Sequence, residues 1–304
     1  MQPTRTPPAG VVVGAVVRRT RGHRGLAPFH TALFDGMEHV LGEHGGHLLV
    51  HLVATAEEET ATYERWAAAG TVSAVLVSDL VTDDPRIGLC RDLGLAVVLL
   101  GEHDRTDVTR IDVDNDAAMG AAVDFLVRLG HTRIGRVSGP PELFHTQIRT
   151  RAFTRHVAAA GVHGTAVEGD YSADSGAAAL RELLAADPGV TAVMFDNDVM
   201  AVAALDAAAA LGRRVPQDLS LLAWDDSPEC RLAHPPLSVV ARDIRGLGLR
   251  SAEVLLAPEP VRVVQARGVV VVPRGSTAPP APTGQPGQPG RPGQPSRVTS
   301  STSA

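Results

Sequence analysis

The stretch TAVMFDNDVMAVAALDAAAALG (residues 191–212) contains the pattern that decides the fold. Its apolar run Ala192–Phe195 has the length of a buried β-strand, and the apolar segment that follows continues to Leu211, a length typical of a helix. Between the two lie an acid, an amide and a second acid, Asp196-Asn197-Asp198. The stretch therefore predicts a strand that leads directly into a helix, with polar side chains at the carboxyl end of the strand.

Strand-like and helix-like segments alternate along the chain on both sides of this stretch. Short apolar runs predict strands at Val11–Val17, His47–Val53, Val72–Ser78, Ala96–Leu100, Arg133–Ser138, Val190–Phe195 and Leu219–Trp224. Patterns with helical spacing predict helices near residues 30–44, 57–69, 84–94, 115–129, 147–160, 175–186 and 198–211. Because strands and helices alternate in this order, we expect parallel sheets with right-handed crossovers.

The number of these units favours two lobes over one long sheet. Roughly four strand–helix units precede a break near Ile111–Asn115, and about three follow it. After Leu237–Ala241, a helix-like segment at Asp243–Leu256 and a strand at Gly268–Val272 remain, and they are too short for a third domain. The predicted fold class is therefore α/β, with two Rossmann-like lobes whose parallel sheets are joined by crossover hinge segments.

The predicted organisation has four parts. They are an N-terminal linker at residues 1–9, an N-terminal lobe at 10–114 plus about 243–258, a C-terminal lobe at 115–242 plus about 259–275, and a tail at 276–304. The tail is rich in Pro, Gly, Gln and Ser and has almost no large apolar residue. Because it cannot bury a core, it is predicted to be disordered.

Composition and charge exclude several classes of function. The formal net charge of −6 argues against a surface that neutralises phosphates, so this chain alone is expected to bind DNA poorly. Cys90 and Cys230 have neither metal-site nor disulfide spacing, which is typical of a cytoplasmic protein. No apolar run is long enough to span a bilayer, so no membrane partner is expected. The stretch Ala9–Val17 weakly resembles a signal peptide, but arginines follow it without a cleavage site, and a first strand is the better interpretation.

Polar side chains follow several of the predicted strands, and ligands of open parallel sheets bind beyond the carboxyl ends of strands. The residues at these positions are Asp196, Asn197 and Asp198; Asp225 and Asp226; Gln147 and Arg149; Arg18, Arg19 and Thr20; and Gly101, Glu102 and His103. Each has a structural alternative, since Asn197 or Asp198 could cap the next helix and Arg149 could lie on the surface. As a set, carboxylates, an amide and a guanidinium from separate strand ends favour a site for a polyol or sugar.

Catalytic and metal-binding motifs find little support. The sequence has no nucleophile elbow, P-loop or H-E-x-x-H motif. The pair Asp225-Asp226 suggests a hydrolase, but adjacent residues of an extended segment point to opposite sides, so only one can face a pocket. His44, His47 and His51 lie close in sequence without a nearby cysteine, and they would have to approach a metal from one edge. We therefore predict neither an enzyme nor a cofactor or metal site.

Three segments carry a resemblance to a known family. They are TRIDVDNDAAMGAAVDFLVRLGHTRIGRVSGP (109–140), TAVMFDNDVMAVAALDAAAALG (191–212) and RVPQDLSLLAWDDSPECRLAHPPLSVV (214–240). In this order they resemble the effector-binding half of the lactose-repressor (LacI/GalR) family of transcriptional regulators, and the likeness runs from about Val11 to Thr277. The resemblance implies a type I periplasmic-binding-protein fold, in which two lobes enclose a small-molecule cleft, and a homodimer.

The resemblance also implies site residues. Arg149 in RTRAF, Asn197 in FDNDVM and Asp225 in AWDDS match ligand-contacting positions of the family, and Phe29 matches an aromatic residue of the N-terminal lobe. Arg242 stands at a hinge-edge position where glutamine is common, and it could favour an acidic ligand or pair with Asp243 or Asp225. The predicted ligand-binding residues are Arg149, Asn197, Asp225, Phe29, Arg242, Arg18 and Trp224.

Three further departures from the family affect the expected ligand, the packing of one helix start and the expected partner. The basic loop RRTRGHRG (18–25) follows the first strand, which leaves room for a sugar phosphate as well as a neutral sugar. Ala152 stands where the family usually has glycine. The family also carries a helix-turn-helix before its first lobe, whereas only ten residues precede Val11 here. We therefore expect operator DNA to be bound only through a head that this chain lacks.

The leading hypothesis is the effector-sensing module of a cytoplasmic, dimeric transcriptional regulator. Its effector is expected to be a sugar, a sugar phosphate or a similar polyol. A secreted or free-standing sugar-binding protein of a transport system is the alternative, and it would require a cleavable signal and a monomer.

Overall fold

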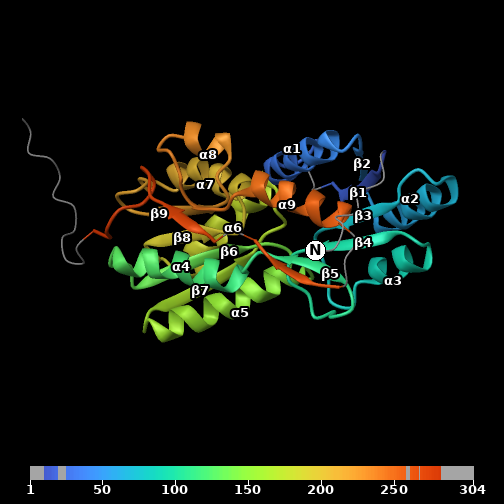
Figure 1. Ribbon diagram of the computed structural model, residues 1–304. Coiled ribbons are helices and arrows are strands. Elements are labelled where there is room, and N and C mark those ends of the chain that lie inside the picture. The colour runs from blue at the N-terminus through green and yellow to red at the C-terminus, as the bar shows by residue number, and fades with distance from the viewer. Residues whose placement is uncertain (1–9, 20–24, 258–260, 267, 282–304) are drawn as a thin grey trace, which may run out of the picture.

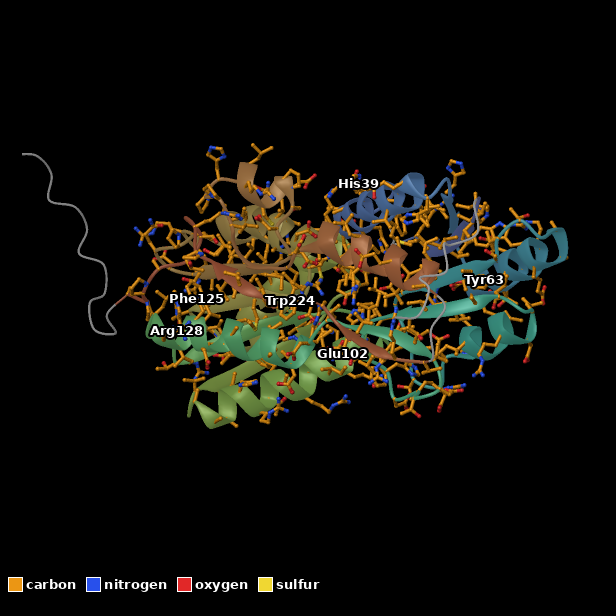
Figure 2. All side chains as sticks on the ribbon, viewed as in Figure 1. His39, Tyr63, Glu102, Phe125, Arg128 and Trp224 are labelled. Atoms are coloured by element: carbon orange, nitrogen blue, oxygen red, sulfur yellow. The ribbon has the colours of Figure 1, made fainter. Side chains whose placement is uncertain are left out.

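The computed structural model describes residues 10–19, 25–257, 261–266 and 268–281, which form two lobes that lie side by side (Figure 1). The N-terminal lobe contains the blue and teal elements together with the orange helix α9, and the C-terminal lobe contains the green and yellow elements and the orange strand β9. Tyr63 and Phe125 lie toward opposite ends of the molecule, whereas Glu102 lies where the lobes meet (Figure 2).

The sheet of the N-terminal lobe has six parallel strands in the order β11-β5-β4-β3-β1-β2. Its strands are β1 (Val12–Arg18), β2 (His47–Val53), β3 (Ala74–Val77), β4 (Ala96–Leu100), β5 (Thr109–Asp112) and β11 (Val263–Gln265). Its helices are α1 (Pro28–Glu43), α2 (Ala56–Ala69), α3 (Pro85–Asp92) and α9 (Ile244–Leu256). Side chains of α1 and α9 pack on one face of this sheet, and those of α2 and α3 pack on the other.

The sheet of the C-terminal lobe repeats this arrangement in the order β12-β10-β9-β8-β6-β7. Its strands are β6 (Arg133–Ser138), β7 (His163–Glu168), β8 (Ala192–Phe195), β9 (Ser220–Trp224), β10 (Ser238–Ala241) and β12 (Val270–Val272). Its helices are α4 (Asn115–Arg128), α5 (Phe144–Ala159), α6 (Ala173–Ala186), α7 (Asp198–Ala210) and α8 (Pro228–Leu232). Only β12 runs antiparallel to its neighbour, among the pairings of the described strands. The predicted α/β class with two parallel-dominated sheets is confirmed.

The sequence explains the local structure of both lobes. The fully buried strands β3 and β8 are continuous apolar runs, as expected for parallel strands with helices on both faces. Thr55 and Ser172 cap the first turns of α2 and α6 with their side-chain oxygens. Glycine permits the close packing of α1 against α9, because a Cβ on Gly248 would lie 1.9 Å from the carbonyl oxygen of Leu33.

The chain crosses between the lobes at three places. They are Val113–Asp114 between β5 and α4, Arg242–Asp243 between β10 and α9, and the connection from the end of β11 at Gln265 to the start of β12 at Val270. We call these three crossovers the hinge. In the described residues, no helix is both long and apolar enough to cross a bilayer.

Three strands differ from the sequence prediction. The segment interpreted as a break near Ile111–Asn115 begins with β5, and β7 was not predicted because its side chains are at most half-buried and form no continuous apolar run. The assignment of residues 259–275 to the C-terminal lobe is wrong for β11, which pairs with β5 in the N-terminal sheet. With three residues, β11 is too short for a recognisable periodicity.

The predicted start of the disordered tail at Ser276 is also wrong. Ser276 is fully buried, and its carbonyl oxygen and hydroxyl bond the N–H and carbonyl of Leu221 in β9. Thr277 bonds Ser238, and Ala278 bonds Ser220 and His131. We call residues 274–278 the C-terminal strap. It is held by hydroxyl and backbone hydrogen bonds, which a prediction from apolar content does not register. Residues 282–304 of the predicted tail and the linker 1–9 lie outside the described residues.

Candidate functional site

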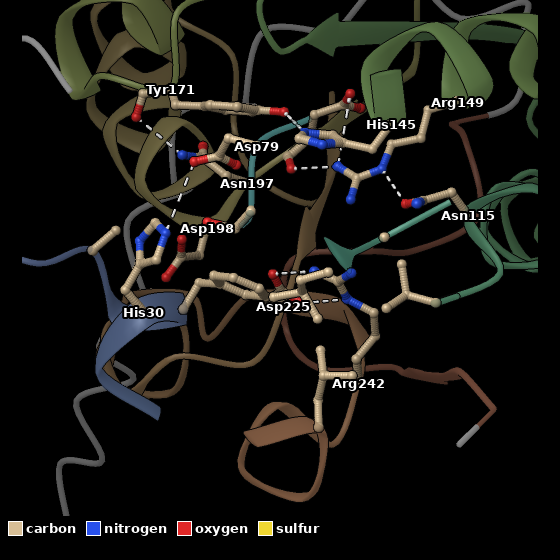
Figure 3. A pocket seen from close by; sticks show the side chains of 18 of the residues that line it. His30, Asp79, Asn115, His145, Arg149, Tyr171, Asn197, Asp198, Asp225 and Arg242 are labelled. Carbon is tan, nitrogen blue, oxygen red and sulfur yellow. Dashed lines mark hydrogen bonds and ion pairs between the residues drawn. The ribbon is translucent and has the colours of Figure 1, made fainter. Parts of the chain in front are cut away.

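A cavity lies between the lobes, beyond the carboxyl ends of strands from both sheets (Figure 3). Its open volume of about 990 Å³, part of it continuous with solvent, is at the upper end of the range of small-molecule sites. The N-terminal lobe and its hinge segment supply Arg18, Ala27, Phe29, His30, Ser78, Asp79, Leu100, Gly101, Val113 and Leu247. The C-terminal lobe and its hinge segment supply Asn115, His145, Arg149, Tyr171, Asp196, Asn197, Asp198, Val199, Asp225 and Arg242. We call this cavity the cleft.

Arg149 projects from α5 into the cleft and is held on three sides. Its Nε donates to Asn115 Oδ1 at 2.7 Å, and its Nη1 donates to the carbonyl oxygen of Asp196 at 3.0 Å. The guanidinium lies 4.1 Å from the ring centroid of Trp224, a distance typical of a cation–π contact. Burial lowers the pKa of Arg149, and the nearby Asp196 carboxylate opposes this shift. The planar group is thus oriented in advance, which favours directional hydrogen bonds to a ligand.

Asp196, to which the sequence assigned no role, forms a buried ion pair. Arg136 Nε and Nη2 donate to its two carboxylate oxygens at 2.8 and 2.5 Å, and Arg136 itself is fully buried. Burial opposes ionisation of Asp196, but the charge and hydrogen bonds of Arg136 outweigh it and hold the pKa of this carboxyl below its usual range. Asp196 therefore lines the cleft as an ionised carboxylate whose charge is balanced by Arg136.

Asp225 and Arg242 form a second pair at the other side of the cleft. Arg242 Nε and Nη2 each donate to one oxygen of Asp225 at 2.7 Å, so Asp225, one of the two partners predicted for Arg242, is bonded to it. The guanidinium also lies 5.6 Å from the ring of Phe29 in the opposite lobe. Burial lowers the pKa of Arg242, but attraction to Asp225 outweighs it, and the net shift is upward. Asp226 faces away from the cleft and pairs with Arg231 and Arg274.

The roles predicted for Asn197 and Asp198 are only partly those observed. Asn197 is the N-cap of α7, since its Oδ1 accepts from the Met200 N–H at 2.9 Å, while its amide donates to the carbonyl of Tyr171. A role as a cap or as a hinge partner was expected of Asp198, but it is the first residue of α7, which Asn197 caps, and it lines the cleft. Burial, with a smaller contribution from Asp225, raises the pKa of Asp198 to about 6, although a hydrogen bond with Ser227 opposes the shift. Both side chains thus reach the cleft, with Asn197 largely satisfied by the protein.

The remaining predicted residues lie in or directly behind the cleft wall. Phe29 lines the cleft from the first turn of α1, and Arg18 lines it at the end of β1, where it pairs with Glu59 at 3.3 Å. Trp224 is 1% exposed and contributes through the two guanidinium groups above it rather than through open surface. Of the basic loop 18–25, residues 20–24 lie outside the described residues.

Several cleft residues were not predicted from the sequence. His30 is 9% exposed, and neither of its ring nitrogens has a hydrogen-bond partner among the described residues; Asp79 Oδ2 lies 3.9 Å from its Nε2. Asp79 directly follows a predicted strand, so the carboxyl-end rule could have identified it. Burial lowers the pKa of His145 to about 4, and its Nε2 lies 2.7 Å from the Tyr171 hydroxyl. Neither His145 nor Tyr171 has a local sequence signal.

Direct contacts join the two lobes beside the cleft. The Phe144 N–H donates to the Leu80 carbonyl at 2.7 Å, and a β-bridge pairs Val81 with Leu143. The ring of His103 stacks on Phe144 at a centroid distance of 5.0 Å. Glu102 accepts from the backbone and side-chain N–H groups of Asn115, both at 2.7 Å, which fixes the hinge residue that holds Arg149. The two lobes that bound the cleft are therefore in direct contact beside it.

The arrangement suits recognition of a polar, uncharged molecule. Three arginines and four aspartates line the cleft, but most of these charges are already paired within the protein. The walls combine hydrogen-bonding groups with the rings of Phe29, His30 and Tyr171. The described residues contain no group of three or more His, Cys, Asp or Glu side chains that could hold a metal ion.

Comparisons with known proteins agree with this fold. The family model of the periplasmic binding protein-like domain matches residues 123–277. The chain is 32% identical over 252 residues to the HTH-type transcriptional regulator CelR of Thermobifida fusca, which covers 78% of this chain and 73% of the relative. It is 35% identical over 218 residues to the regulator MalR of Streptomyces coelicolor, which covers 67% of this chain and 62% of the relative.

Solved structures show the same similarity. The crystal structure of a LacI family transcriptional regulator from Bifidobacterium animalis subsp. lactis has a TM-score of 0.80 and 33% identity, and the match covers 89% of this chain and 98% of that one. A CelR–cellobiose complex also has a TM-score of 0.80, with 28% identity and coverage of 89% and 86%. These relatives are transcriptional regulators rather than enzymes. Motifs, fold and relatives agree, and the chain belongs to the LacI family of transcriptional regulators.

Proposed function

We propose that the cleft binds a neutral sugar, of the size of a mono- or disaccharide, as the effector of a transcriptional regulator. The observation that carries this proposal is the pre-oriented guanidinium of Arg149, held by Asn115 and the Asp196 carbonyl over Trp224. A planar donor beside aromatic rings and carboxylates matches the hydroxyl groups and apolar faces of a pyranose. The CelR–cellobiose complex supports this class of ligand.

The pairing of charges favours a neutral sugar over a sugar phosphate. Arg242 is neutralised by Asp225, and Arg18 is directed to Glu59. Asp79 and Asp198 add negative charge to the same cavity. Of the three lining arginines, only Arg149 could meet a phosphate without displacing one of these intramolecular pairs. Displacing a pair would cost the free energy of an unpaired buried charge.

We further propose that occupancy of the cleft changes the relation between the lobes and so controls operator binding by a cytoplasmic homodimer. The hinge crossovers and the contacts between Leu80–Val81 and Leu143–Phe144 are the elements that a change in lobe orientation would alter. The net charge of −6 does not suit the lobes for contact with phosphates. We therefore assign DNA contact to a helix-turn-helix segment outside the two lobes.

The test is a thermal-shift screen of cellobiose, maltose, glucose, glucose 6-phosphate and nucleosides with the chain as given. A ligand at about 100 times its Kd stabilises the folded state by about 2.7 kcal/mol, so a true effector raises the melting temperature. We expect a neutral sugar to give the largest rise. A rise with the phosphate alone would contradict the neutral class, and no rise with any sugar would contradict the proposal.

The variants Asp225→Ala and Asp226→Ala form a matched pair for this test. The two residues are adjacent, but Asp225 lines the cleft and Asp226 does not. We expect Asp225→Ala to abolish the sugar-dependent rise in melting temperature and Asp226→Ala to retain it. Equal responses of the two variants would place the sugar elsewhere.

A further inference from the structure

We propose that Arg136 is a positioning residue of the cleft: by occupying both carboxylate oxygens of Asp196, it keeps Arg149 directed toward the ligand. Arg136 does not line the cleft itself, and its effect is exerted through Asp196. The part of this inference that concerns ligand affinity rests on the proposed function; the part that concerns the orientation of Arg149 does not.

The position of Arg136 is unusual for an arginine. It lies within β6, between β7 and β8 in the sheet, with a fully buried side chain. Replacing a buried ion pair by apolar residues of similar size is often neutral or stabilising, so such a pair is weak support for stability. All of its bonds are directional: Nε and Nη2 to Asp196, and Nη1 to the Thr150 hydroxyl at 2.9 Å. The guanidinium is thus fixed, and it fixes the carboxylate in turn.

Asp196 presents two different acceptors to two arginines. Its carboxylate takes the fork of Arg136, and its Oδ2 also accepts from the Gly139 N–H at 3.3 Å. Its backbone carbonyl accepts from Arg149 Nη1 at 3.0 Å, whereas the same nitrogen lies 3.9 Å from Oδ2. Arg149 therefore bonds a neutral carbonyl and not the charged group beside it.

The alternative state follows from the charges. Without Arg136, the buried Asp196 carboxylate would have lost both charge-assisted hydrogen bonds, and Arg149 would be the nearest cation. A movement of less than 1.5 Å would turn the 3.9 Å approach into a hydrogen-bonded pair. Arg149 would then leave Asn115 and the face of Trp224. Its guanidinium would bond the Asp196 carboxylate instead of a ligand. Arg136 prevents this capture.

The experiment compares Arg136→Met with the double variant Arg136→Met/Asp196→Asn. Both lack Arg136, so any effect of losing its packing is common to them. Only the single variant keeps a carboxylate that can capture Arg149. The readout is the NMR resonance of the Trp224 indole N–H, measured without any ligand. Arg149 lies over this ring, and Trp224 Nε1 has no hydrogen-bond partner among the described residues, so the resonance reports on the position of the guanidinium. Trp66→Phe assigns the two indole signals.

We expect the Trp224 resonance to move in Arg136→Met and to return toward its wild-type position in the double variant. An unchanged resonance in the single variant, or the same displacement in both variants, would overturn the proposal. If Arg136→Met does not fold, Arg136→Lys decides, because an ammonium cannot fork and leaves one carboxylate oxygen to Arg149. The resonance should then move in part, and a wild-type position would overturn the proposal.

Calorimetry with cellobiose supplies the second readout. We expect affinity at least about tenfold weaker in Arg136→Met, as for the loss of a hydrogen bond to a charged group, and a return to within about threefold of wild type in the double variant. Equal losses in the two variants would overturn the role of Asp196. Should cellobiose not bind the wild type, that result counts against the proposed ligand, and the indole resonance still decides the role of Arg136.

Discussion

Each lobe contains a buried arginine that donates two hydrogen bonds to the carboxylate of an aspartate. The two clusters differ in the third charged group that joins this pair. In the N-terminal lobe, Arg86 bonds Asp84 with Nε and Nη2 and Glu59 with Nη1, so one buried guanidinium meets two carboxylates. In the C-terminal lobe, Asp196 meets two buried guanidinium groups, those of Arg136 and Arg149. The surplus charge is negative in the first cluster and positive in the second.

The two clusters also differ in where the extra charged group lies, inside the lobe or at the cleft. The extra carboxylate of Glu59 is satisfied within the lobe by the Tyr63 hydroxyl at 3.2 Å and by the half-exposed Arg18. The extra guanidinium of Arg149 reaches the cleft. We therefore expect loss of the Arg86 guanidinium to affect stability and loss of the Arg149 guanidinium to affect the proposed ligand binding.

The largest effect is expected from Arg86→Met, which would leave Asp84 and Glu59 buried without their cation. Breaking a buried ion pair in this way costs about 3–5 kcal/mol, so the free energy of unfolding in urea should fall by this amount. Arg91→Met is the control, because Arg91 pairs with Asp107 on the surface. A loss no greater than that of the control would mean that the Arg86 cluster contributes nothing to stability.

The opposite pattern is expected from Arg149→Met. Affinity for the effector should fall by about 2 kcal/mol or more, because ligand groups that bond the guanidinium lose their partner. The melting temperature without ligand should change far less than in Arg86→Met. Arg151→Met, an exposed site two residues along the same helix, is the control. Calorimetry that shows unchanged affinity in Arg149→Met would remove the distinction between the two clusters.

Asp198 gives a smaller effect that depends on pH. Because its pKa is raised from 3.8 to about 6 in the folded state, the native protein binds more protons than the unfolded chain between these values. Stability from this group therefore falls as pH rises from about 4 to 6 and is level above that. Asp198→Asn should remove this slope and be more stable than wild type at pH 7, by on the order of 2 kcal/mol.

The check is a series of urea unfolding curves from pH 4 to 8 for the wild type and Asp198→Asn. The difference between the two curves isolates Asp198 from His145, whose lowered pKa acts in the opposite direction. A difference that is constant with pH would show that Asp198 has an ordinary pKa.

The smallest effect is expected at the surface. Arg214 and Asp218 form a bidentate pair on the exterior of the C-terminal lobe, with Arg214 73% exposed. Exposed pairs contribute little, since water and salt screen them, so Arg214→Ala should leave the melting temperature unchanged within error. A decrease comparable to that of Arg86→Met would show that burial is not what distinguishes the clusters.

Most of the fold could be predicted because it rests on local patterns. The run Ala192–Phe195 and the apolar segment after it are a strand and a helix, as predicted. Short or half-exposed elements carry too few apolar residues for a pattern, and β5, β7 and β11 were missed for that reason. The lobe to which β11 belongs depends on the pairing of Val264 with Ile111, which are far apart in the sequence, and no local signal contains that information.

The cleft was predictable where it depends on strand ends and not where it depends on partners. The carboxyl-end rule selected Asn197, Asp225 and Arg149, which the structure brings to one cavity. The role of Asp196 could not be inferred, because Arg136 stands 60 positions away on a neighbouring strand. His30 is likewise placed by the packing of α1 and not by a motif.

The C-terminal strap has a practical consequence for anyone who shortens or extends this chain. Ser276 and Ala278 supply the hydrogen-bond partners of Leu221, Ser238 and Ser220 at the amino-terminal ends of β9 and β10. A recombinant fragment that ends at Val272 would leave these backbone and hydroxyl groups without partners in the interior. Affinity tags and fluorescent fusions belong after residue 281, where they follow the strap instead of replacing it.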